Sequence, residues 1–312
     1  MAIDLYGGDY EYTLDLGGDA IRYHAIPIVG LFQRMIRERA YEACEFSLAN
    51  YILMKDAGAD WLHAVPVFLN RSFRHGTIYV RAGSKMTDPA DLRGRKIGVP
   101  DYSMTAAVWV RGLLNEQYGV HWSDLTWFCD AAHERFRPPE GVRLTQVSQD
   151  LETMLADGEI DAFISFGPRD ERLPQGERKL RRLLPDYLAV EREYYRATGI
   201  YPINHCVVVR SDLLQREPGA PAALFDAYSR AKTRAYERRI GSTLMPWGKA
   251  YWAEAFEPFG GDPMPHGLTD NNRRIVDKLV EYLHEQQFIT RKWSADSLFV
   301  DGAAAFRESA TS

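Results

Sequence analysis

The chain contains little cysteine. Cys44, Cys129 and Cys206 are its three cysteines among 312 residues, and no C-x-x-C pair occurs. That spacing argues against a disulfide framework and against the usual structural zinc site. An odd number also leaves at least one thiol unpaired within a monomer. We therefore expect reduced, buried thiols of the kind found in cytoplasmic proteins.

The chain also lacks long apolar runs and an excess of positive charge. No stretch approaches the roughly 18 apolar residues that span a bilayer. The segment Met1–Leu5 shows neither the basic region nor the apolar core of a secretory signal. The net charge is −5, and Lys and Arg are dispersed without forming a basic stripe. These absences predict a cytoplasmic protein with no membrane partner and no nucleic-acid partner.

Motifs for cofactors and activated nucleophiles are missing as well. There is no glycine-rich phosphate loop, no G-x-S-x-G turn and no lysine context that suggests a Schiff base. The histidines nowhere show H-x-H or H-x-x-x-H spacing. We expect no cofactor. A divalent metal held by His75, His205 and Glu45 stays an open alternative.

What the chain does contain is an alternation of short apolar strands and amphipathic helices. The expected strands are 20–28, 42–48, 61–68, 76–80, 95–99, 125–128, 144–147, 161–165 and 203–210, and the expected helices include 31–39, 50–57, 150–156, 221–239 and 271–287. This order predicts an α/β protein with parallel sheets covered by helices on both faces. Ser148 is the expected N-cap of the helix that begins at Asp150, and Gly158 is its expected end.

The segment Ile97–Trp109 is the most informative local pattern. A buried strand ends at Pro100, and a small polar cluster then opens a helix that runs to Tyr118. A strand, a polar turn and a helix N-terminus together direct backbone N–H groups at an anion. Because Tyr102 and Thr105 lie at the same turn, the segment predicts a pocket for a small aromatic carboxylate. An ordinary βα turn is the alternative interpretation.

Longer blocks of sequence add a family resemblance. They are LRGRKIGVPDYSMTAAVWVRGLL (92–114), LADGEIDAFIS (155–165), YYRATGIYPINHCVVVR (194–210), CEFSLANYI (44–52), VPVFLNRSFRHGTIYV (65–80), LPDY (184–187) and MPWG (245–248). Together they resemble the 4,5-dihydroxyphthalate decarboxylase family over roughly residues 20–290. The first 20 residues, with their two Gly-Gly pairs, match that family less well.

The resemblance implies an architecture. It predicts an α/β fold of the type 2 periplasmic-binding-protein kind, with two lobes and a ligand cleft between them. The first lobe would comprise residues 1–93 and 205–312, and the second residues 94–204, so that the chain crosses between the lobes twice.

The resemblance also implies an activity. It predicts a cytoplasmic carbon–carbon lyase that removes CO₂ from a hydroxylated aromatic (di)carboxylic acid without oxidation. The expected reaction converts 4,5-dihydroxyphthalate into 3,4-dihydroxybenzoate by protonation of the ring carbon that carries the carboxylate. A solute-binding protein, or another small-acid enzyme on the same fold, is the alternative. The expected partners are the substrate and further copies of the same chain.

Candidate acids and bases lie beside apolar strands. His75 and His205 can exchange protons near neutral pH, because the usual pKa of histidine is about 6.5. Glu45 and Ser47 alternate along one strand, so their side chains are expected on one face. We predict His75, His205 and Glu45 as catalytic residues and Ser47 as a substrate-binding residue. For each histidine, a core position satisfied by a backbone carbonyl is the alternative.

Candidate carboxylate anchors are arginines and the turn described above. Arg74 is the first choice, because a guanidinium fork binds a carboxylate bidentately, whereas Arg71 is expected on the surface. The resemblance adds Arg169, which follows Gly167-Pro168. The remaining predicted substrate-binding residues are Tyr102, Ser103, Met104, Thr105, Tyr201 and Trp247.

Overall fold

The computed structural model describes residues 2–130, 136–240 and 245–308, which form two compact units. The first unit comprises Met1–Ser72, Thr198–Lys278 and Trp293–Ser312, and the second comprises Phe73–Ala197 and Leu279–Lys292. Two lobes were expected, the first discontinuous and the second continuous over 94–204, whereas both units are discontinuous and their boundaries differ from the predicted 93 and 204. The chain passes between the units at 72, 197, 278 and 292. The first shift arises because strand β5 (Ile78–Arg81) already belongs to the second sheet.

The first unit is built on a sheet of five strands in the order β2-β1-β3-β11-β4. The strands are β1 (Ile3–Gly7), β2 (Ile21–Ala25), β3 (Ala43–Ser47), β4 (Leu62–Phe68) and β11 (His205–Arg210). Strand β1 is parallel to β2 and β3, whereas β11 is antiparallel to β3 and β4. All five residues of β3 are buried, as expected for a central strand.

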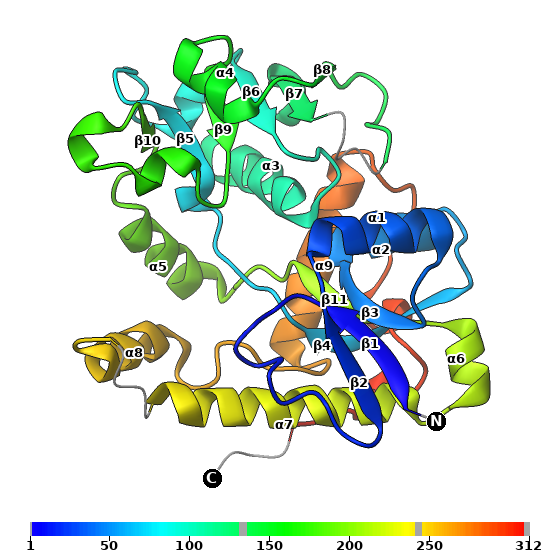
Figure 1. Cartoon of the computed structure of the whole chain (residues 1–312). Coiled ribbons are helices and arrows are strands. Elements are labelled where there is room, and N and C mark those ends of the chain that lie inside the picture. The colour runs from blue at the N-terminus through cyan, green and yellow to red at the C-terminus, as the bar shows by residue number, and fades with distance from the viewer. Residues whose placement is uncertain (1, 131–135, 241–244, 309–312) are drawn as a thin grey trace. The chain divides into compact units, whose positions relative to one another are not determined.

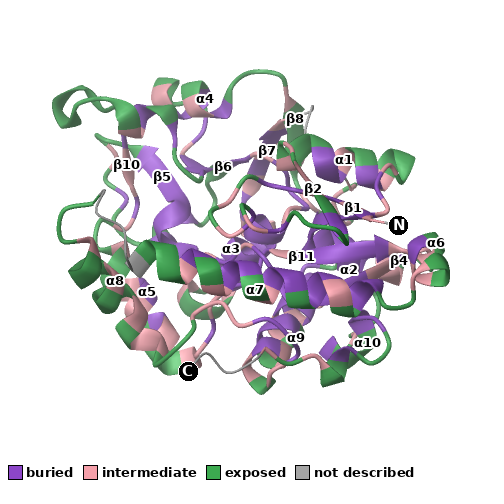
Figure 2. Cartoon of the chain, turned by 60° about the horizontal axis from the view of Figure 1, so that its bottom comes forward, coloured by how far each residue is buried: buried purple, intermediate pink, exposed green. Residues whose placement is uncertain are grey.

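The remaining elements of the first unit are helices and 3-10 turns (Figure 1). They are α1 (Ile28–Glu38), α2 (Leu48–Asp56), α6 (Ser211–Arg216), α7 (Ala220–Ile240), α8 (Gly248–Phe256) and α10 (Ala295–Leu298), together with the first part of α9 (Asp270–Glu285) and the 3-10 turns Glu257–Phe259 and Ala303–Ala305. Helix α1 packs against β3 and α7 packs against β4. The α7 residues Leu224, Phe225 and Tyr228 recur at helical spacing and are buried, so that helix shows a buried and an exposed side (Figure 2).

The second unit holds a sheet of six strands in the order β10-β5-β9-β6-β7-β8. Beyond β5, these are β6 (Lys96–Val99), β7 (Thr126–Asp130), β8 (Leu144–Val147), β9 (Ala162–Ile164) and β10 (Leu180–Arg182). Its helices are α3 (Thr105–Tyr118), α4 (Leu151–Asp157), α5 (Tyr187–Thr198) and the end of α9, and its 3-10 turns are His75–Thr77, Pro89–Leu92, Trp122–Asp124, Arg169–Arg172 and Gln175–Glu177.

The α/β class is confirmed, but the expectation of parallel sheets is wrong in each unit. Strand β11 runs antiparallel to its neighbours, as does β5 in the second sheet. Ser148 is not the cap of α4. The Asp150 side chain caps it by accepting the N–H of Thr153 at 2.9 Å, because Asp150 directly precedes the first helical residue. Gly158 ends that helix as predicted, with φ of 83°.

Other local outcomes follow from burial. Cys44, Cys129 and Cys206 are buried thiols, as expected. Strands β1 and β10 and helices α5, α6, α8 and α10 were not predicted as separate elements. Among the described residues, no helix combines the length and apolar character needed to cross a membrane.

Candidate active site

Glu45 is a completely buried carboxylate at the centre of the first sheet. Its Oε2 accepts the backbone N–H of Gly8 at 2.8 Å. Its Oε1 accepts the Tyr10 hydroxyl at 2.8 Å and lies 2.6 Å from Nδ1 of His205. Three donors therefore surround the carboxylate, and they offset the cost of removing its charge from water.

His205 is the first residue of β11 and is held in a defined orientation. Strand pairing places it opposite Ser47, two residues along β3 from Glu45. The edge of the Phe32 ring, which comes from α1, packs against the imidazole with 5.0 Å between ring centroids. The His205 side chain is 13% exposed, and its Nε2 has no hydrogen-bond partner within the described part of the chain. A carboxylate on Nδ1 and an unbound Nε2 make this ring suited to proton transfer.

The turn after β1 brings Tyr10 to Glu45. A Cβ atom at Gly7 would lie 2.6 Å from the Tyr23 hydroxyl and 3.4 Å from Oε2 of Glu45, so only glycine lets these groups approach. The Tyr23 hydroxyl in turn donates to the carbonyl of Gly8 at 2.5 Å. The turn is therefore fixed from both sides, and its backbone and side chains complete the surroundings of the carboxylate.

Burial and the negative charge of Glu45 keep the nearby phenols protonated. Both effects raise the pKa of Tyr10 and of Tyr23, with burial the larger effect. Burial likewise raises the pKa of Tyr12, whose hydroxyl donates to the Leu69 carbonyl at 2.6 Å. These tyrosines therefore act as hydrogen-bond donors at neutral pH.

An open pocket of about 380 Å³ adjoins the cluster. Gly8, Asp9 and Tyr10 line one side, and residues 25–28, which lead into α1, line the other. That volume is within the range of small-molecule sites. Because Gly8 and Tyr10 also bind Glu45, the pocket and the carboxylate–histidine pair share a wall.

Three further predicted residues lie in the first unit. The buried Ser47 caps α2, since its hydroxyl accepts the N–H of Asn50 at 3.4 Å. Tyr201 donates its hydroxyl to the carbonyl of Arg71 at 3.2 Å and packs on Phe259. Trp247 precedes α8 and is 75% exposed. The structure therefore brings together Glu45 and His205, while Ser47 has a capping role and Trp247 faces solvent.

Arg74 and His75 are adjacent and buried in the second unit. Both line a small cavity of about 10 Å³ with apolar neighbours such as Leu114. His75 Nε2 pairs with Oε1 of Gln117 at 2.9 Å, and burial lowers the pKa of the ring. The guanidinium of Arg74 lies 5.0 Å from the centre of the Phe166 ring. His75 is therefore neutral at pH 7, and its catalytic role stays a prediction.

The predicted turn 102–105 does begin a helix, α3, but its side chains point into the core of the second unit. Tyr102 is 3% exposed and packs edge-on against Trp127, while the Arg111 guanidinium lies 3.9 Å from its ring centre. Ser103 donates its hydroxyl to Oδ1 of Asp101 at 2.7 Å. Thr105 is buried, and Met104 packs against the same core. Tyr102 is therefore a core residue, because burying its aromatic ring stabilises the second unit more than leaving the ring in solvent would.

Arg169 is bound by acidic side chains of its own unit. Its guanidinium is 65% exposed, with Nη2 at 2.5 Å from Asp150 and Nε at 3.5 Å from Glu152. These two carboxylates already engage Nη2 and Nε of Arg169. The opposite correction applies to Arg71, which was expected on the surface but is 7% exposed.

No group of three or more His, Cys, Asp or Glu side chains able to hold a metal occurs in residues 2–130, 136–240 and 245–308. The open alternative of a metal shared by His75, His205 and Glu45 therefore gains no support from the described residues.

Sequence reasoning missed Tyr10 and the Gly7-Gly8 turn. One signal was available: a Gly-Gly pair directly after a short apolar strand marks a close approach of backbone to another group. Which group approaches could not be read locally, because Glu45 lies 37 residues beyond Gly8.

Comparison with known proteins extends the picture. No protein-family model matches the chain. A 4,5-dihydroxyphthalate decarboxylase of Comamonas testosteroni is 34% identical over 283 residues, which are 86% of this chain and 85% of that protein. A 4,5-dihydroxyphthalate decarboxylase of Pseudomonas putida is 39% identical over 177 residues, which are 54% of this chain and 68% of that protein.

Solved structures are similar in fold. The periplasmic aliphatic sulphonate binding protein SsuA from Escherichia coli has a TM-score of 0.59 at 14% identity, with 98% of this chain and 99% of that chain covered. The desulfurization enzyme DSZB has a TM-score of 0.52 at 13% identity, with 97% and 98% covered. These likenesses confirm the predicted periplasmic-binding-protein-like α/β fold. The identity and coverage of the Comamonas relative show that this chain belongs to the 4,5-dihydroxyphthalate decarboxylase family.

Proposed function

We propose that this chain is a carbon–carbon lyase that converts 4,5-dihydroxyphthalate into 3,4-dihydroxybenzoate and CO₂ without oxidation. The name and coverage of the Comamonas relative support the reaction. Within the structure, the observation that carries the proposal is the contact of 2.6 Å between His205 Nδ1 and Glu45 Oε1. Fold likeness alone would support a binding protein equally well.

The reaction needs one proton and no oxidant. Each carboxylate of the substrate is para to a hydroxyl, and removal of the hydroxyl proton moves electron density to the ring carbon that bears the carboxylate. A proton then adds to that carbon, and the bond to the carboxylate breaks. The electron pair of that bond returns to the ring, which restores aromaticity as neutral CO₂ leaves, and the phenolate oxygen takes back the proton that was removed from it.

His205 is the proposed acid and base. With Nδ1–H bound to Glu45, the neutral ring presents a lone pair at Nε2, and the protonated ring presents an N–H there. The same nitrogen can therefore take the hydroxyl proton or deliver a proton to the ring carbon. Glu45 acts as a positioning residue, because its charge stabilises the protonated imidazole and fixes the orientation of the ring.

The other predicted roles remain part of the proposal. Arg74 and the backbone N–H groups at the start of α3 are the predicted carboxylate anchors of the second unit, and His75 is the predicted second proton-transfer group. No cofactor is expected. Self-association and a cytoplasmic location are likewise predictions.

A direct assay tests the function. Purified protein treated with EDTA is incubated with 4,5-dihydroxyphthalate, and CO₂ and 3,4-dihydroxybenzoate are followed. We expect turnover, which falls about 10²–10⁴-fold in His205→Asn because general acid–base catalysis contributes that much. His24→Asn is the matched control, since His24 pairs with Asp4 on the same sheet and is 37% exposed. Activity that returns only when a divalent metal is added would show a metal requirement. Tight ligand binding without turnover would instead indicate a solute-binding protein.

A further inference from the structure

Arg71 is a buried cation that pairs with no carboxylate among the residues that the structure describes. It is 7% exposed and lies just after β4, where it forms a bridge with Ile203. Its Nη2 donates to the carbonyl of Pro265 and to Oδ1 of Asn272, each at 2.8 Å. Both acceptors are neutral, and burial lowers the pKa of this guanidinium to about 10. Arginine is rarely buried unless it is paired, so this position needs an explanation.

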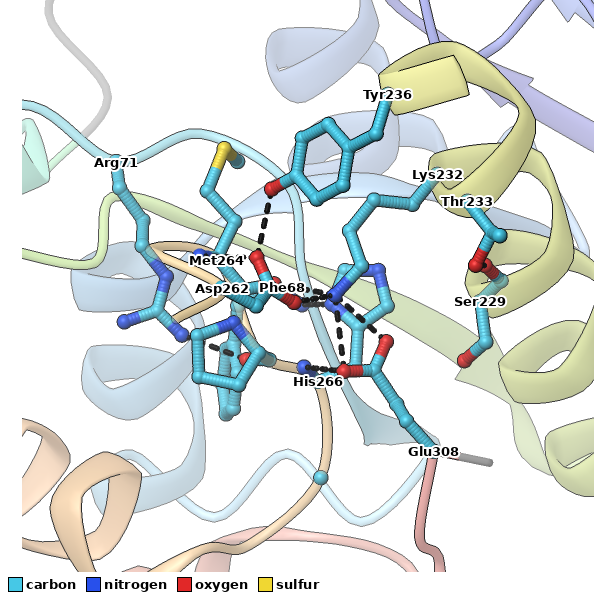
Figure 3. A network of polar contacts seen from close by, with 12 residues as sticks. Phe68, Arg71, Ser229, Lys232, Thr233, Tyr236, Asp262, Met264, His266 and Glu308 are labelled. Carbon is cyan, nitrogen blue, oxygen red and sulfur yellow. Dashed lines mark hydrogen bonds and ion pairs between the residues drawn. The ribbon is translucent and has the colours of Figure 1, made fainter. Parts of the chain in front are cut away.

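The segment that holds Arg71 is itself clamped onto α7. Lys232 of that helix binds Asp262, the Met264 carbonyl at 2.8 Å and Oε1 of Glu308 at 2.7 Å, as the dashed lines of Figure 3 show. Glu308 also accepts the backbone N–H of His266 at 3.1 Å. Residues 262–266 are therefore fixed from both ends, and they present the Pro265 carbonyl to Arg71 in one position.

The nearby acids are committed to this clamp. Asp262 accepts the hydroxyl of Tyr236 at 2.6 Å and the backbone N–H of Met264 at 2.8 Å, in addition to binding Lys232. Asp262 and Glu308 act on Arg71 only through space. Their charges are among those that raise its pKa, but burial lowers the pKa by more. Their combined charge helps the protein tolerate the guanidinium, but neither carboxylate accepts one of its hydrogens.

Two nitrogens of Arg71 consequently lack an acceptor among the described residues. Nε is sealed from solvent and makes no hydrogen bond. Nη1 makes no hydrogen bond either, but unlike Nε it is not sealed from solvent. In Figure 3 no dashed line joins the guanidinium of Arg71 to the carboxylate of Asp262 or of Glu308. A fixed guanidinium with a reachable donor suits an anionic oxygen, because charge-assisted bonds are the stronger kind.

Strand pairing connects Arg71 to the candidate active site. The N–H of Leu69 donates to the carbonyl of His205 at 3.2 Å, and the N–H of Asn204 donates to the carbonyl of Asn70 at 2.7 Å. Asn70 also interacts through its side chain with Tyr10, the phenol that binds Glu45. Arg71 thus follows directly on residues that touch both His205 and Tyr10, at the same end of the first sheet.

We propose that Arg71 binds a carboxylate of the aromatic substrate through Nη1, and so sets the specificity of this family member for acids. The proposal rests on the proposed function for the identity of the substrate but not for the binding itself. It revises the choice of Arg74 as first anchor by adding one in the unit that holds His205. A bound carboxylate would give the buried guanidinium the charged partner that it lacks.

Two probes separate carboxylate recognition from general binding. Phthalate carries both carboxylates and no hydroxyl, whereas catechol carries both hydroxyls and no carboxylate. We expect Arg71→Met to weaken phthalate binding, measured by calorimetry, by roughly 10- to 100-fold, as the loss of a charge-assisted hydrogen bond implies. Catechol binding should change by less than about twofold, and KM for 4,5-dihydroxyphthalate should rise in parallel with the phthalate Kd. Arg216→Met is the matched control, since Arg216 pairs with Glu42 and is 44% exposed.

The outcomes distinguish this inference from the proposed function. Unchanged phthalate affinity in a folded Arg71→Met protein, or an equal loss for phthalate and catechol, would overturn the role of Arg71 whether or not the enzyme turns over. Wild-type protein that binds phthalate through Arg71 yet releases no CO₂ would support this role and contradict the lyase. If Arg71→Met does not fold, Arg71→Lys keeps the charge. That variant should still lose at least about fivefold in phthalate affinity, because an ammonium group cannot reproduce the fork geometry. Wild-type phthalate affinity in Arg71→Lys would then refute the proposal.

Discussion

Replacement of Glu45 by glutamine tests the carboxylate–histidine pair most directly. The carboxylate accepts three hydrogen bonds, from Gly8, Tyr10 and His205. Glutamine has nearly the same shape but offers one oxygen and one NH₂ group. If its oxygen faces His205, its NH₂ group meets the N–H of Gly8. If it is turned around, the NH₂ group meets Nδ1 of His205 and moves the imidazole proton to Nε2.

The magnitude follows from these two arrangements. A buried donor left without an acceptor costs about 1–3 kcal/mol, so the free energy of unfolding should fall by that amount. The bond between a protonated imidazole and the carboxylate is charge-assisted. Loss of the negative charge therefore lowers the stabilisation of the transition state by about 2–3 kcal/mol. At about 1.4 kcal/mol per factor of ten, kcat/KM should fall about 100-fold.

The assay is CO₂ release from 4,5-dihydroxyphthalate, with thermal unfolding measured on the same samples. Glu42→Gln is the control. The carboxylate of Glu42 also accepts a backbone N–H, that of Asp4 at 2.9 Å, but it does not touch His205. Its kcat/KM should stay within about twofold of wild type. A Glu45→Gln enzyme that keeps kcat/KM within about threefold, while it remains folded, would refute the assigned role of this pair.

Other predictions concern the supporting structure. Gly7→Ala places a Cβ 2.6 Å from the hydroxyl of Tyr23, so we expect a loss of about 1–3 kcal/mol in stability together with reduced turnover; Gly17→Ala, where nothing lies within 4 Å, should change neither in the same assays. Lys232→Met leaves the carboxylates of Asp262 and Glu308, which are 28% and 20% exposed, without their shared cation. We expect the free energy of unfolding, measured in urea, to fall by about 2–3 kcal/mol. A fall of less than about 0.5 kcal/mol would contradict the role of Lys232 in the clamp. Burial, with positive neighbours, holds the pKa of His266 well below its usual value, so the unfolded chain takes up a proton that the folded chain does not. The corresponding stability is complete above about pH 6.5 and is lost as the pH falls below that value. Between about pH 7 and 5, the free energy of unfolding of His266→Asn should therefore fall less steeply than that of wild type. Equal slopes would contradict this assignment.

Part of the site could be found from the sequence because its residues belong to strongly patterned strands. Glu45 stands out as a charged residue within a fully buried run, and His205 stands out at the start of an apolar strand. Local pattern could not show that they meet, since 160 residues separate them and β11 pairs antiparallel to β3. The alternation of strands and helices along the chain favours parallel pairing. Parallel pairing of β11 with β3 would have given a different register.

The arginines show where local reasoning ends. Arg71 and Arg74 are three residues apart, were expected in opposite environments, and are both buried. Arg71 is buried because a segment almost two hundred residues later, held by Lys232 and Glu308, supplies its carbonyl acceptor. Tyr102 was expected in a pocket and instead packs on Trp127, a residue of strand β7.

The sequence by itself determined most of the elements and the α/β class, because hydrophobic periodicity and turn residues act over a few neighbouring positions. The family followed from the resemblance of longer blocks such as residues 92–114. Tertiary structure alone decided that Tyr10 joins Glu45, that Ser47 caps a helix and that Arg71 is enclosed. These outcomes depend on strand order and register between distant segments. The free energy that selects a register is spread over the whole core, so no single stretch of the chain carries it.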